Sequence, residues 1–327
     1  MTCYSHDCNA ATKGAAPEQF KRIMDTTYVT ESGCTVEKFR LHSPSMERDI
    51  KVAIVLPPAY KTDQSRKFPI LYTLHGSGAP YDTYAAMSIL QAQLKDKPFI
   101  YTCFDGDDHS MFLDAKFPMV TARKSEKDTI KRKSLFDTFF FAEFIPAIDS
   151  WYRVDINKRG LTGFSMGGFG ALHYALVHPE MFCSVSGLSS VFMESSTIPD
   201  WGRNMLQGIL GPIKENRAAY EAVDHYKRLA VLKATGVAIP PIYLACGTED
   251  GLLKQSRKMK GYMDSLHIPS EYREAPGIHN WIFWHAESVG IAEFHWKYFI
   301  AKEGKEGSQK NKDEGKSAKL PVKENKK

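Results

Sequence analysis

Short apolar runs alternate with longer amphipathic stretches along most of the chain. Continuous apolar runs bounded by Gly, Pro or Asp are typical of strands buried on both faces, whereas apolar residues at every third or fourth position are typical of helices. Strands are predicted near residues 28–41, 49–56, 70–74, 99–104, 160–164, 182–188, 242–246 and 270–274. Helices are predicted near residues 83–94, 135–151, 166–178, 252–266 and 285–300.

The order of these elements predicts the fold class. From the third strand onward, strands and helices alternate, which is typical of a mainly parallel sheet with helices on both faces. Residues 49–52 alternate polar with apolar, which favours an antiparallel strand with one wetted face near the sheet edge. We therefore expect an α/β fold in which a mainly parallel sheet forms the middle layer of a three-layer αβα sandwich.

The longest departure from the alternation lies between residues 190 and 231. This excursion leaves the sheet at its carboxyl edge, where ligands bind in open α/β folds. It contains Trp201 and Met205, which are candidates for the lining of an acyl pocket or cap. The alternative is an accessory helix pair that covers the edge of the sheet.

Composition agrees with one large domain. The 327 residues are 43% hydrophobic, and we expect a catalytic domain over 26–301 between a flexible segment, 1–25, and a disordered tail, 302–327. The tail holds nine lysines and five acidic residues, so it carries most of the net charge of +5 and leaves the rest of the chain nearly neutral. Nucleic-acid binding is therefore not expected. A second basic cluster, 123–133, is predicted on a loop, where it is either solvated or attracts anionic substrates.

Several other classes of protein are not expected. No run of about 18 apolar residues is present, so no transmembrane segment is predicted. The start lacks a charged and apolar leader, so the chain as written is expected in the cytoplasm, although a mature form of an exported protein fits equally. Cys103, Cys183 and Cys246 fall in predicted buried strands, while Cys3, His6 and Cys8 lack a fourth ligand. Neither a disulfide framework nor a metal site is expected.

The most informative motif is Gly163-Phe164-Ser165-Met166-Gly167, which joins the predicted strand 160–164 to the predicted helix 166–178. A serine on such a tight strand-to-helix turn projects from the carboxyl edge of the sheet, and flanking glycines let strand and helix cross closely. Ser165 is therefore a candidate nucleophile. Taken alone, the pattern also fits a glycine-rich helix start packed on a strand.

A second segment supports this interpretation. The predicted strand 70–74 is followed by His75-Gly76-Ser77-Gly78. Serine hydrolases with such a turn bind the tetrahedral oxyanion with the N–H after the nucleophile and an N–H from the loop after an earlier strand. Met166 and Ser77 would supply these donors, and His75 and Gly76 would lie against the substrate. An ordinary glycine turn is the alternative.

Two later segments offer partners for the serine. The predicted strand 242–246 ends in a turn with Glu249 and Asp250, and either carboxylate could orient a catalytic imidazole. The loop after the predicted strand 270–274 carries His279, which can reach a serine. His285 and His295 fall on the following helix and are expected to pack or to contact solvent. Trp281 could line the substrate site, or Trp281 and Trp284 could both anchor the last helix.

Together these motifs resemble the putative esterase family, also called the esterase D-like group, which includes small acyl esterases, feruloyl and acetyl-xylan esterases, S-formylglutathione hydrolases and mycolyltransferases. The resemblance implies the α/β-hydrolase fold and a triad of Ser165, Asp250 and His279, with no metal or organic cofactor. It favours Asp250 over Glu249. The residues that carry it are 74–76, 163–172, 178–182, 246–250 and 279–284.

The resemblance implies a serine carboxylic-ester hydrolase acting on a small acyl, acetyl or feruloyl ester, including carbohydrate-linked esters. Acyl transfer to a carbohydrate or lipid alcohol, thioester hydrolysis of the S-formylglutathione type, and a silent binding module are alternatives. The chain departs from the family at Gly78-Ala79-Pro80, where a second glycine pair often stands, and at residues 105–112, which lack a Trp-Tyr pair. The oligomeric state is left open.

Overall fold

The structure is a computed structural model that describes residues 20–121, 130–198 and 200–317. Its centre is a nine-stranded sheet with the order β1-β2-β3-β5-β4-β8-β9-β10-β11. Its strands are β1 (Arg22–Val29), β2 (Thr35–Ser43), β3 (Arg48–Leu56), β4 (Phe68–Leu74), β5 (Ile100–Phe104), β8 (Val154–Phe164), β9 (Ser184–Leu188), β10 (Ile242–Gly247) and β11 (Ser270–Ala275). A separate two-stranded hairpin consists of β6 (Met119–Thr121) and β7 (Ile130–Arg132).

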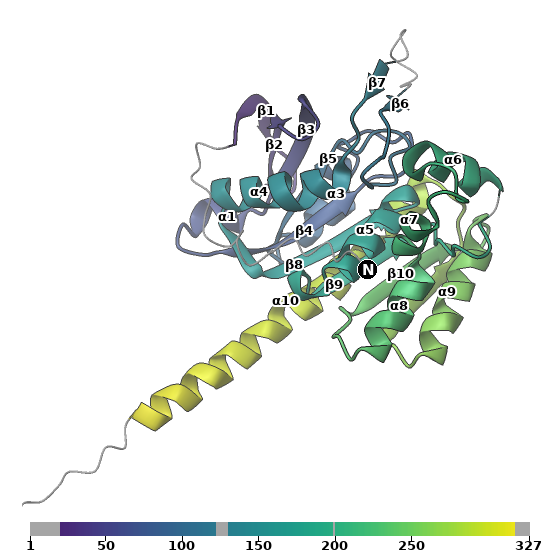
Figure 1. The fold of residues 1–327 in the computed structure, drawn as a ribbon. Coiled ribbons are helices and arrows are strands. Elements are labelled where there is room, and N and C mark those ends of the chain that lie inside the picture. Colours follow the sequence, from purple (N-terminus) through teal and green to yellow (C-terminus); the bar gives the residue numbers. More distant parts are fainter. Residues whose placement is uncertain (1–19, 122–129, 199, 318–327) are drawn as a thin grey trace, which may run out of the picture.

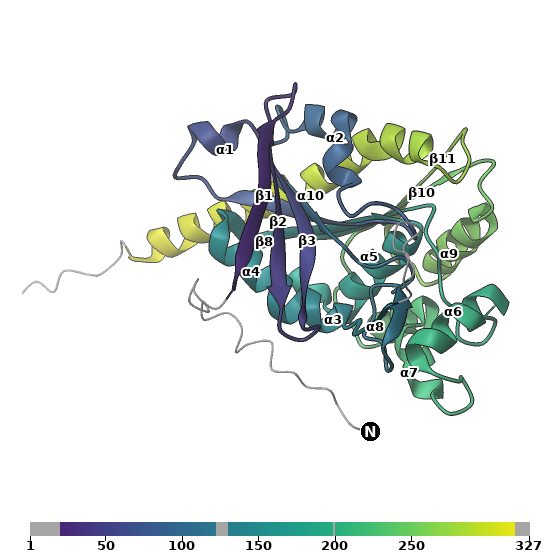
Figure 2. The same cartoon turned by 90° about the horizontal axis from the view of Figure 1, so that it is seen from above.

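Helices cover both faces of the sheet (Figures 1 and 2), with α2 and α10 on one face and α3, α4, α5, α8 and α9 on the other. The helices are α1 (Ala59–Thr62), α2 (Ser88–Gln93), α3 (Phe136–Thr138), α4 (Ile145–Trp151), α5 (Met166–Val177), α6 (Asp200–Leu210), α7 (Arg217–Ala222), α8 (His225–Ala234), α9 (Leu253–Ser265) and α10 (Trp281–Ser317). Short helices η3 (Tyr84–Ala86) and η5 (Pro179–Met181) and a π-helix, η4 (Phe139–Phe144), complete the set. The expected three-layer αβα sandwich is confirmed.

The strand directions confirm the mainly parallel sheet. β5, β4, β8, β9, β10 and β11 are parallel, whereas β1, β2 and β3 are antiparallel and β3 also pairs antiparallel with β5. The predicted antiparallel strand near residues 49–52 is therefore confirmed as part of β3. The parallel direction brings the carboxyl ends of β4, β8, β9, β10 and β11 to one edge of the sheet.

The core lies in two layers because the central strands are buried on both sides. All seven residues of β4 are buried; Tyr72 belongs to the hydrophobic cluster under α3, α4 and α5, and Leu71 belongs to the cluster under α2 and α10. Tyr174 of α5 stacks on Phe140 with their ring centroids 4.5 Å apart. This two-sided burial explains why the parallel strands appear in the sequence as continuous apolar runs.

Some predicted elements differ from the observed ones. The stretch 28–41, predicted as one strand, is a hairpin of β1 and β2, because residues 30–34 form a turn closed by a 2.9 Å hydrogen bond from Gly33 N–H to Thr30 O. The predicted helix 135–151 is interrupted by π-helical η4, which contains the buried Glu143. The predicted helix 83–94 is divided into η3 and α2. The excursion 190–231 holds three helices, α6, α7 and α8.

The ends of the predicted domain also shift. β1 begins at Arg22, so ordered structure starts within the segment expected to be flexible, and residues 1–19, with Cys3, His6 and Cys8, lie outside the described residues. α10 continues to Ser317 (Figure 1), so residues 302–317 are helical where a disordered tail was expected. Extending an existing helix fixes one residue for each hydrogen bond gained and needs no new nucleus. Residues 318–327 are not described.

The basic cluster 123–133 lies only partly within the described residues. Its end belongs to β7, which pairs with β6, so this part is a hairpin strand where a loop was expected; residues 122–129 lie outside the described ranges. In the described chain, Cys34, Cys103, Cys183 and Cys246 are buried and form no disulfides. None of the helices described is long and apolar enough to cross a membrane. Across the same residues, no group of three His, Cys, Asp or Glu side chains is arranged to hold a metal ion.

Candidate active site

Ser165 occupies a strained turn between β8 and α5. Its backbone has φ 56° and ψ −118°, a combination that non-glycine residues rarely adopt. The glycines on either side allow the close crossing: a Cβ on Gly163 would lie 2.1 Å from Gly167 O, and a Cβ on Gly167 would lie 2.0 Å from Leu74 O. The local sequence therefore holds the serine at the carboxyl edge of the sheet.

His279 lies between Ser165 and Asp250. Its Nε2 is 3.0 Å from Ser165 Oγ, and its Nδ1 is 2.9 Å from Asp250 Oδ2 and 3.1 Å from Oδ1. The ionised carboxylate can only accept, so Nδ1 carries the proton and Nε2 is free to accept the hydrogen of the serine hydroxyl. The three side chains follow β8, β10 and β11, which lie far apart in the sequence.

Burial and hydrogen bonding act in opposite directions on Asp250. Its side chain has no exposed surface, and this burial raises its pKa. Hydrogen bonds from His279, from the Ser189 side chain and from Leu252 N–H outweigh burial, so the pKa is lowered below its ordinary value. The carboxylate therefore stays charged beside the imidazole. Glu249 is exposed, and no hydrogen bond to His279 is found for it among the described residues.

Ser189, which was not among the expected site residues, also belongs to this network. Ser189 directly follows β9, is fully buried and has φ 45°. Its side chain bonds to Asp250, and its Oγ accepts a 3.1 Å hydrogen bond from Trp284 Nε1–H. A signal was available, because Ser189 follows β9 at the same sheet edge at which Ser165 follows β8.

Trp284 connects several parts of the site. Its ring stacks on Phe164, the last residue of β8, with centroids 4.3 Å apart and an interplanar angle of 15°. It also meets the His279 ring edge-on at 5.0 Å. Trp284 therefore anchors the start of α10, as one of the two interpretations of its sequence position predicted, and at the same time contacts the imidazole.

The two expected oxyanion donors, Met166 and Ser77, follow the neighbouring strands β8 and β4. Met166 is the first residue of α5, so its N–H has no acceptor within the helix. Ser77 lies in the loop after β4, which neighbours β8 in the sheet. The Ser77 hydroxyl donates to Asp108 O at 2.5 Å and lies 2.7 Å from His109 Nδ1. Met166 at the start of α5 and Ser77 in the loop after β4 therefore follow neighbouring strands at the carboxyl edge of the sheet.

His75 and Gly76 have supporting positions. His75 is only 1% exposed; its Nδ1–H donates to Gly76 O at 2.8 Å and its Nε2 accepts from Gly106 N–H at 2.9 Å. The ring is enclosed between two loops, so it has almost no surface for the direct contact with substrate that was expected of it. A Cβ on Gly76 would lie 2.8 Å from the Phe164 ring, so Gly76 permits close packing below the serine.

The other pocket candidates are divided between core and surface. Trp281 is partly buried and stacks on His285 with centroids 5.4 Å apart, and Met205 is partly buried against the core. The side chain of Trp201 lies outside the described residues.

His285 accepts from Ile89 N–H at 3.2 Å, and His295 is buried between two serines of β9, so the packing expected of these histidines is confirmed.

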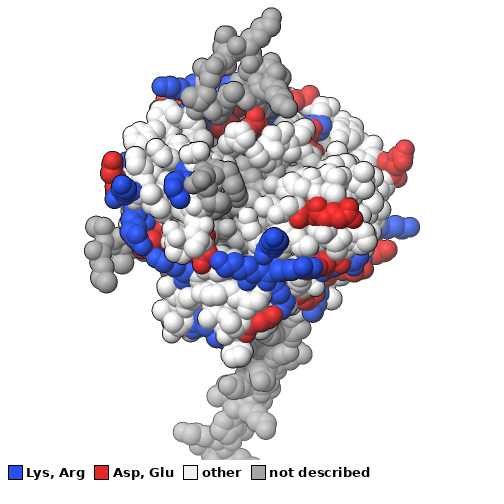
Figure 3. Space-filling view, turned by 90° about the vertical axis from the view of Figure 1, so that its right-hand side faces the viewer, with Lys and Arg blue, Asp and Glu red and all other residues white. Residues whose placement is uncertain are grey.

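One side of the molecule has few charged side chains in its middle. Figure 3 looks onto this side, where β8 and β10 end; Lys and Arg side chains form a row below the uncharged area, and acidic side chains lie to its right. Ile278 and Ile282 are exposed large apolar residues, the first in the loop that carries His279 and the second at the start of α10. They add exposed apolar surface to these two segments.

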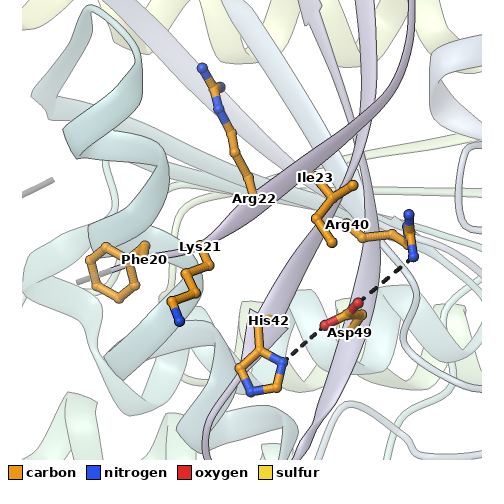
Figure 4. A pocket seen from close by; sticks show the side chains of 7 residues that line it. All are labelled: Phe20, Lys21, Arg22, Ile23, Arg40, His42 and Asp49. Carbon is orange, nitrogen blue, oxygen red and sulfur yellow. Dashed lines mark hydrogen bonds and ion pairs between the residues drawn. The ribbon is translucent and has the colours of Figure 1, made fainter. Parts of the chain in front are cut away.

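A separate hollow of about 570 Å³ lies at the antiparallel end of the sheet (Figure 4). It contains an Asp–His pair as well, since Asp49 lies 2.9 Å from His42 Nδ1 and also pairs with Arg40. Among the described residues, no serine, threonine or cysteine lines this hollow. Its lining residues are Phe20, Lys21, Arg22, Ile23, Arg40, His42 and Asp49.

Comparison with known proteins gives a consistent family. Residues 43–294 match the model of the family described as "Putative esterase". Esterase Rv1288 of Mycobacterium tuberculosis is 25% identical over 263 residues, which cover 74% of this chain and 55% of that protein, so the chain spans about half the length of this relative. The acetyl esterase of Caldicellulosiruptor saccharolyticus is 24% identical over 277 residues, which cover 76% of this chain and 93% of that protein.

A solved structure extends the comparison to the fold. The S-formylglutathione hydrolase of Agrobacterium tumefaciens matches with a TM-score of 0.70 and 18% sequence identity, over 84% of this chain and 99% of that one. At this identity the match concerns the arrangement of sheet and helices. The family model covers most of the chain, and the chain therefore belongs to the putative esterase family and has the α/β-hydrolase fold.

Proposed function

We propose that this protein is a serine carboxylic-ester hydrolase in which Ser165 is the nucleophile, His279 the general base and Asp250 the residue that orients the imidazole. The observation that carries the proposal is the pair of hydrogen bonds made by His279, 3.0 Å to the serine and 2.9 Å to the carboxylate. Membership of the putative esterase family supports the same reaction.

The proposed reaction has two steps. His279 Nε2 takes the hydroxyl proton of Ser165 while Oγ attacks the ester carbonyl, and the oxyanion accepts hydrogen bonds from Met166 N–H and Ser77 N–H. The alcohol leaves with the proton from His279, and an acyl-enzyme remains. Water then repeats the attack and releases the acid. Each oxyanion donor is worth about 3 kcal/mol of transition-state stabilisation in such sites.

For the substrate we propose a small acyl, acetyl or feruloyl ester, with carbohydrate-linked esters included. One feature supports an uncharged ester: Ile278 and Ile282, one and three residues from His279 in the sequence, are exposed apolar side chains. The name of one relative, an acetyl esterase, points in the same direction.

The decisive experiment is a hydrolysis screen with 4-nitrophenyl esters from acetate to decanoate, beside methyl ferulate, acetylated xylan and S-formylglutathione. We expect turnover of short acyl esters and covalent labelling of Ser165 by a fluorophosphonate. Ser165→Ala should lower kcat by about 10⁶-fold and abolish labelling. Ser265→Ala, at the exposed end of α9, is the matched control. No hydrolysis and no labelling of the wild-type protein would refute the proposed activity.

The same screen tests the proposed pocket residues. If Trp201 and Met205 line the acyl site, their replacement by Ala should change the relative rates of acetate and decanoate esters. Equal chain-length profiles in wild type and variants would assign the excursion 190–231 to packing alone. Product transfer to an added alcohol that outruns hydrolysis would favour an acyltransferase.

A further inference from the structure

The loops that follow β4 and β5 lie side by side, since these strands are neighbours in the sheet. The β5 loop, residues 105–112, has an unusual backbone. Asp107, Met111 and Phe112 have φ angles of 54°, 54° and 56°, although none of them is glycine. Such conformations cost free energy and persist only where the surroundings hold them, and they are concentrated at functional sites.

Hydrogen bonds connect this loop to the loop that carries Ser77. Gly106 N–H donates to His75 Nε2, and the Ser77 hydroxyl donates to Asp108 O at 2.5 Å. The only hydroxyl proton of Ser77 is used in that bond, so the 2.7 Å contact with His109 requires Nδ1–H of His109 to donate to Ser77 Oγ. The Ser77 side chain is therefore held from two positions.

An ion pair anchors the strained loop to the sheet. Arg48 at the start of β3 donates to both carboxylate oxygens of Asp107, at 3.0 Å and 2.7 Å. The Asp107 side chain is 3% exposed and that of Arg48 is 17% exposed. Bidentate pairs of this kind fix direction as well as distance, and a buried carboxylate is strongly disfavoured without its partner.

We propose that the 105–112 loop, anchored by Arg48 and Asp107, positions the N–H of Ser77 for the oxyanion, with His109 as the positioning residue that holds the Ser77 side chain. This inference rests on the proposed function, because it assumes that Ser77 N–H binds the oxyanion. The physical reason is that an oxyanion donor acts only when it is already aimed at the charge that develops in the transition state.

The test compares Ser77→Ala and His109→Ala with wild type on 4-nitrophenyl acetate and with phenylboronic acid, whose tetrahedral serine adduct places an oxygen at the oxyanion position. Both variants keep the backbone N–H of residue 77 but lose its support. We expect kcat to fall about tenfold at nearly constant KM, a fraction of the effect of deleting a donor. The inhibition constant of the boronic acid should rise by a similar factor.

A conservative variant separates positioning from a general structural role. His109→Asn retains an N–H donor near Ser77 Oγ and should recover most of the lost kcat. Arg48→Lys removes the bidentate geometry and should also lower kcat, whereas Arg257→Lys breaks the exposed bidentate pair with Glu274 and should leave kcat unchanged. If Arg48→Lys fails to fold, the variants Ser77→Ala and His109→Ala, whose positions are exposed, still test whether the loop positions the Ser77 N–H.

The outcomes are distinct. If Ser77→Ala and His109→Ala stay within twofold of wild type for kcat and for the boronic acid, while the fluorophosphonate still labels Ser165, the inference is wrong and the proposed function stands. If wild type is neither active nor labelled, the proposed function fails and the inference fails with it.

Discussion

Two of the Asp–His pairs found among the described residues have the same separation and opposite surroundings. Asp250 and His279 at the parallel edge, and Asp49 and His42 at the antiparallel end, both have an Oδ to Nδ1 distance of 2.9 Å. The carboxylate of Asp250 has no exposed surface, whereas Asp49 and His42 are 34% and 50% exposed. Distance alone therefore does not distinguish them.

The surroundings differ in three physical respects. At the parallel edge a hydroxyl lies on the other imidazole nitrogen, the backbone at Ser165 and Ser189 is strained, and the acid is screened from water. At the antiparallel end the acid is shared with exposed Arg40, and the hollow is open along the edge of the sheet (Figure 4). Exposed pairs of this kind contribute about 0–1 kcal/mol. Burial and convergence therefore support the catalytic role proposed for the first pair, whereas the second pair has only a concave surface beside it.

The largest effect is expected when the carboxylate of each Asp–His pair is replaced in turn by an amide. Asp250→Asn should lower kcat/KM for 4-nitrophenyl acetate by about 10⁴-fold, because the amide no longer fixes the tautomer or stabilises the imidazolium. Asp49→Asn is the matched control and should leave kcat/KM within about twofold. Similar losses in the two variants would mean that the buried acid has no special role.

The second test concerns packing at the Ser165 turn. Gly167→Ala should destabilise the fold by about 3 kcal/mol or prevent folding, because the added Cβ would meet Leu74 O at 2.0 Å. Gly208→Ala in α6 is the control: no atom lies within 4 Å of its added Cβ, and the change should be neutral or slightly stabilising. Urea unfolding measures both, and a stable Gly167→Ala protein would contradict the close crossing.

The third test measures how the burial of two other histidines, His225 and His295, makes stability depend on pH. Burial lowers the pKa of His225 to about 4 and that of His295 to about 3. Above pH ~6.5 both imidazoles are neutral in the folded and in the unfolded state, so they do not lower the free energy of unfolding. As the pH falls from ~6.5 toward 4, only the unfolded state takes them up, and stability should fall by about 1.4 kcal/mol per pH unit for each histidine.

Urea unfolding at pH 7 and pH 5 measures this slope. The variant His295→Asn should unfold more easily at pH 7 but lose less stability on acidification than wild type. An equal loss in both proteins would show that His295 is not the group responsible.

The smallest effect is expected at the antiparallel hollow. Arg40→Lys weakens an exposed network with Asp49, so the free energy of unfolding should change by less than about 0.5 kcal/mol. Thermal unfolding and ester turnover measured side by side check this. A clear loss of turnover would give the hollow a role that its exposed charges do not suggest.

Much of the fold could be predicted from local pattern. The predicted parallel strands agree with the observed ones to within two residues at each end, except that β8 begins at Val154, six residues before the predicted start, in a partly exposed polar stretch. The central strands could be located because strands buried on both faces are rich in apolar side chains. The failures lie where local pattern is ambiguous. The hairpin of β1 and β2 looks like one long strand, and the π-helix η4 lies in the nearly continuous apolar run FFFAEF, whose pattern does not distinguish a π-helix from an α-helix.

From the residues alone, the glycines at positions 163 and 167 indicated a tight turn at Ser165, and the order of serine, acid and histidine along the chain could be read directly. The assembled fold was needed to show which chemical groups meet: that Gly167 packs on Leu74, that His75 is enclosed and that Ser189 supports Asp250. The reason is physical. Backbone conformation is limited by neighbouring residues, whereas burial and hydrogen-bond partners depend on segments that approach one another only when the sheet is assembled.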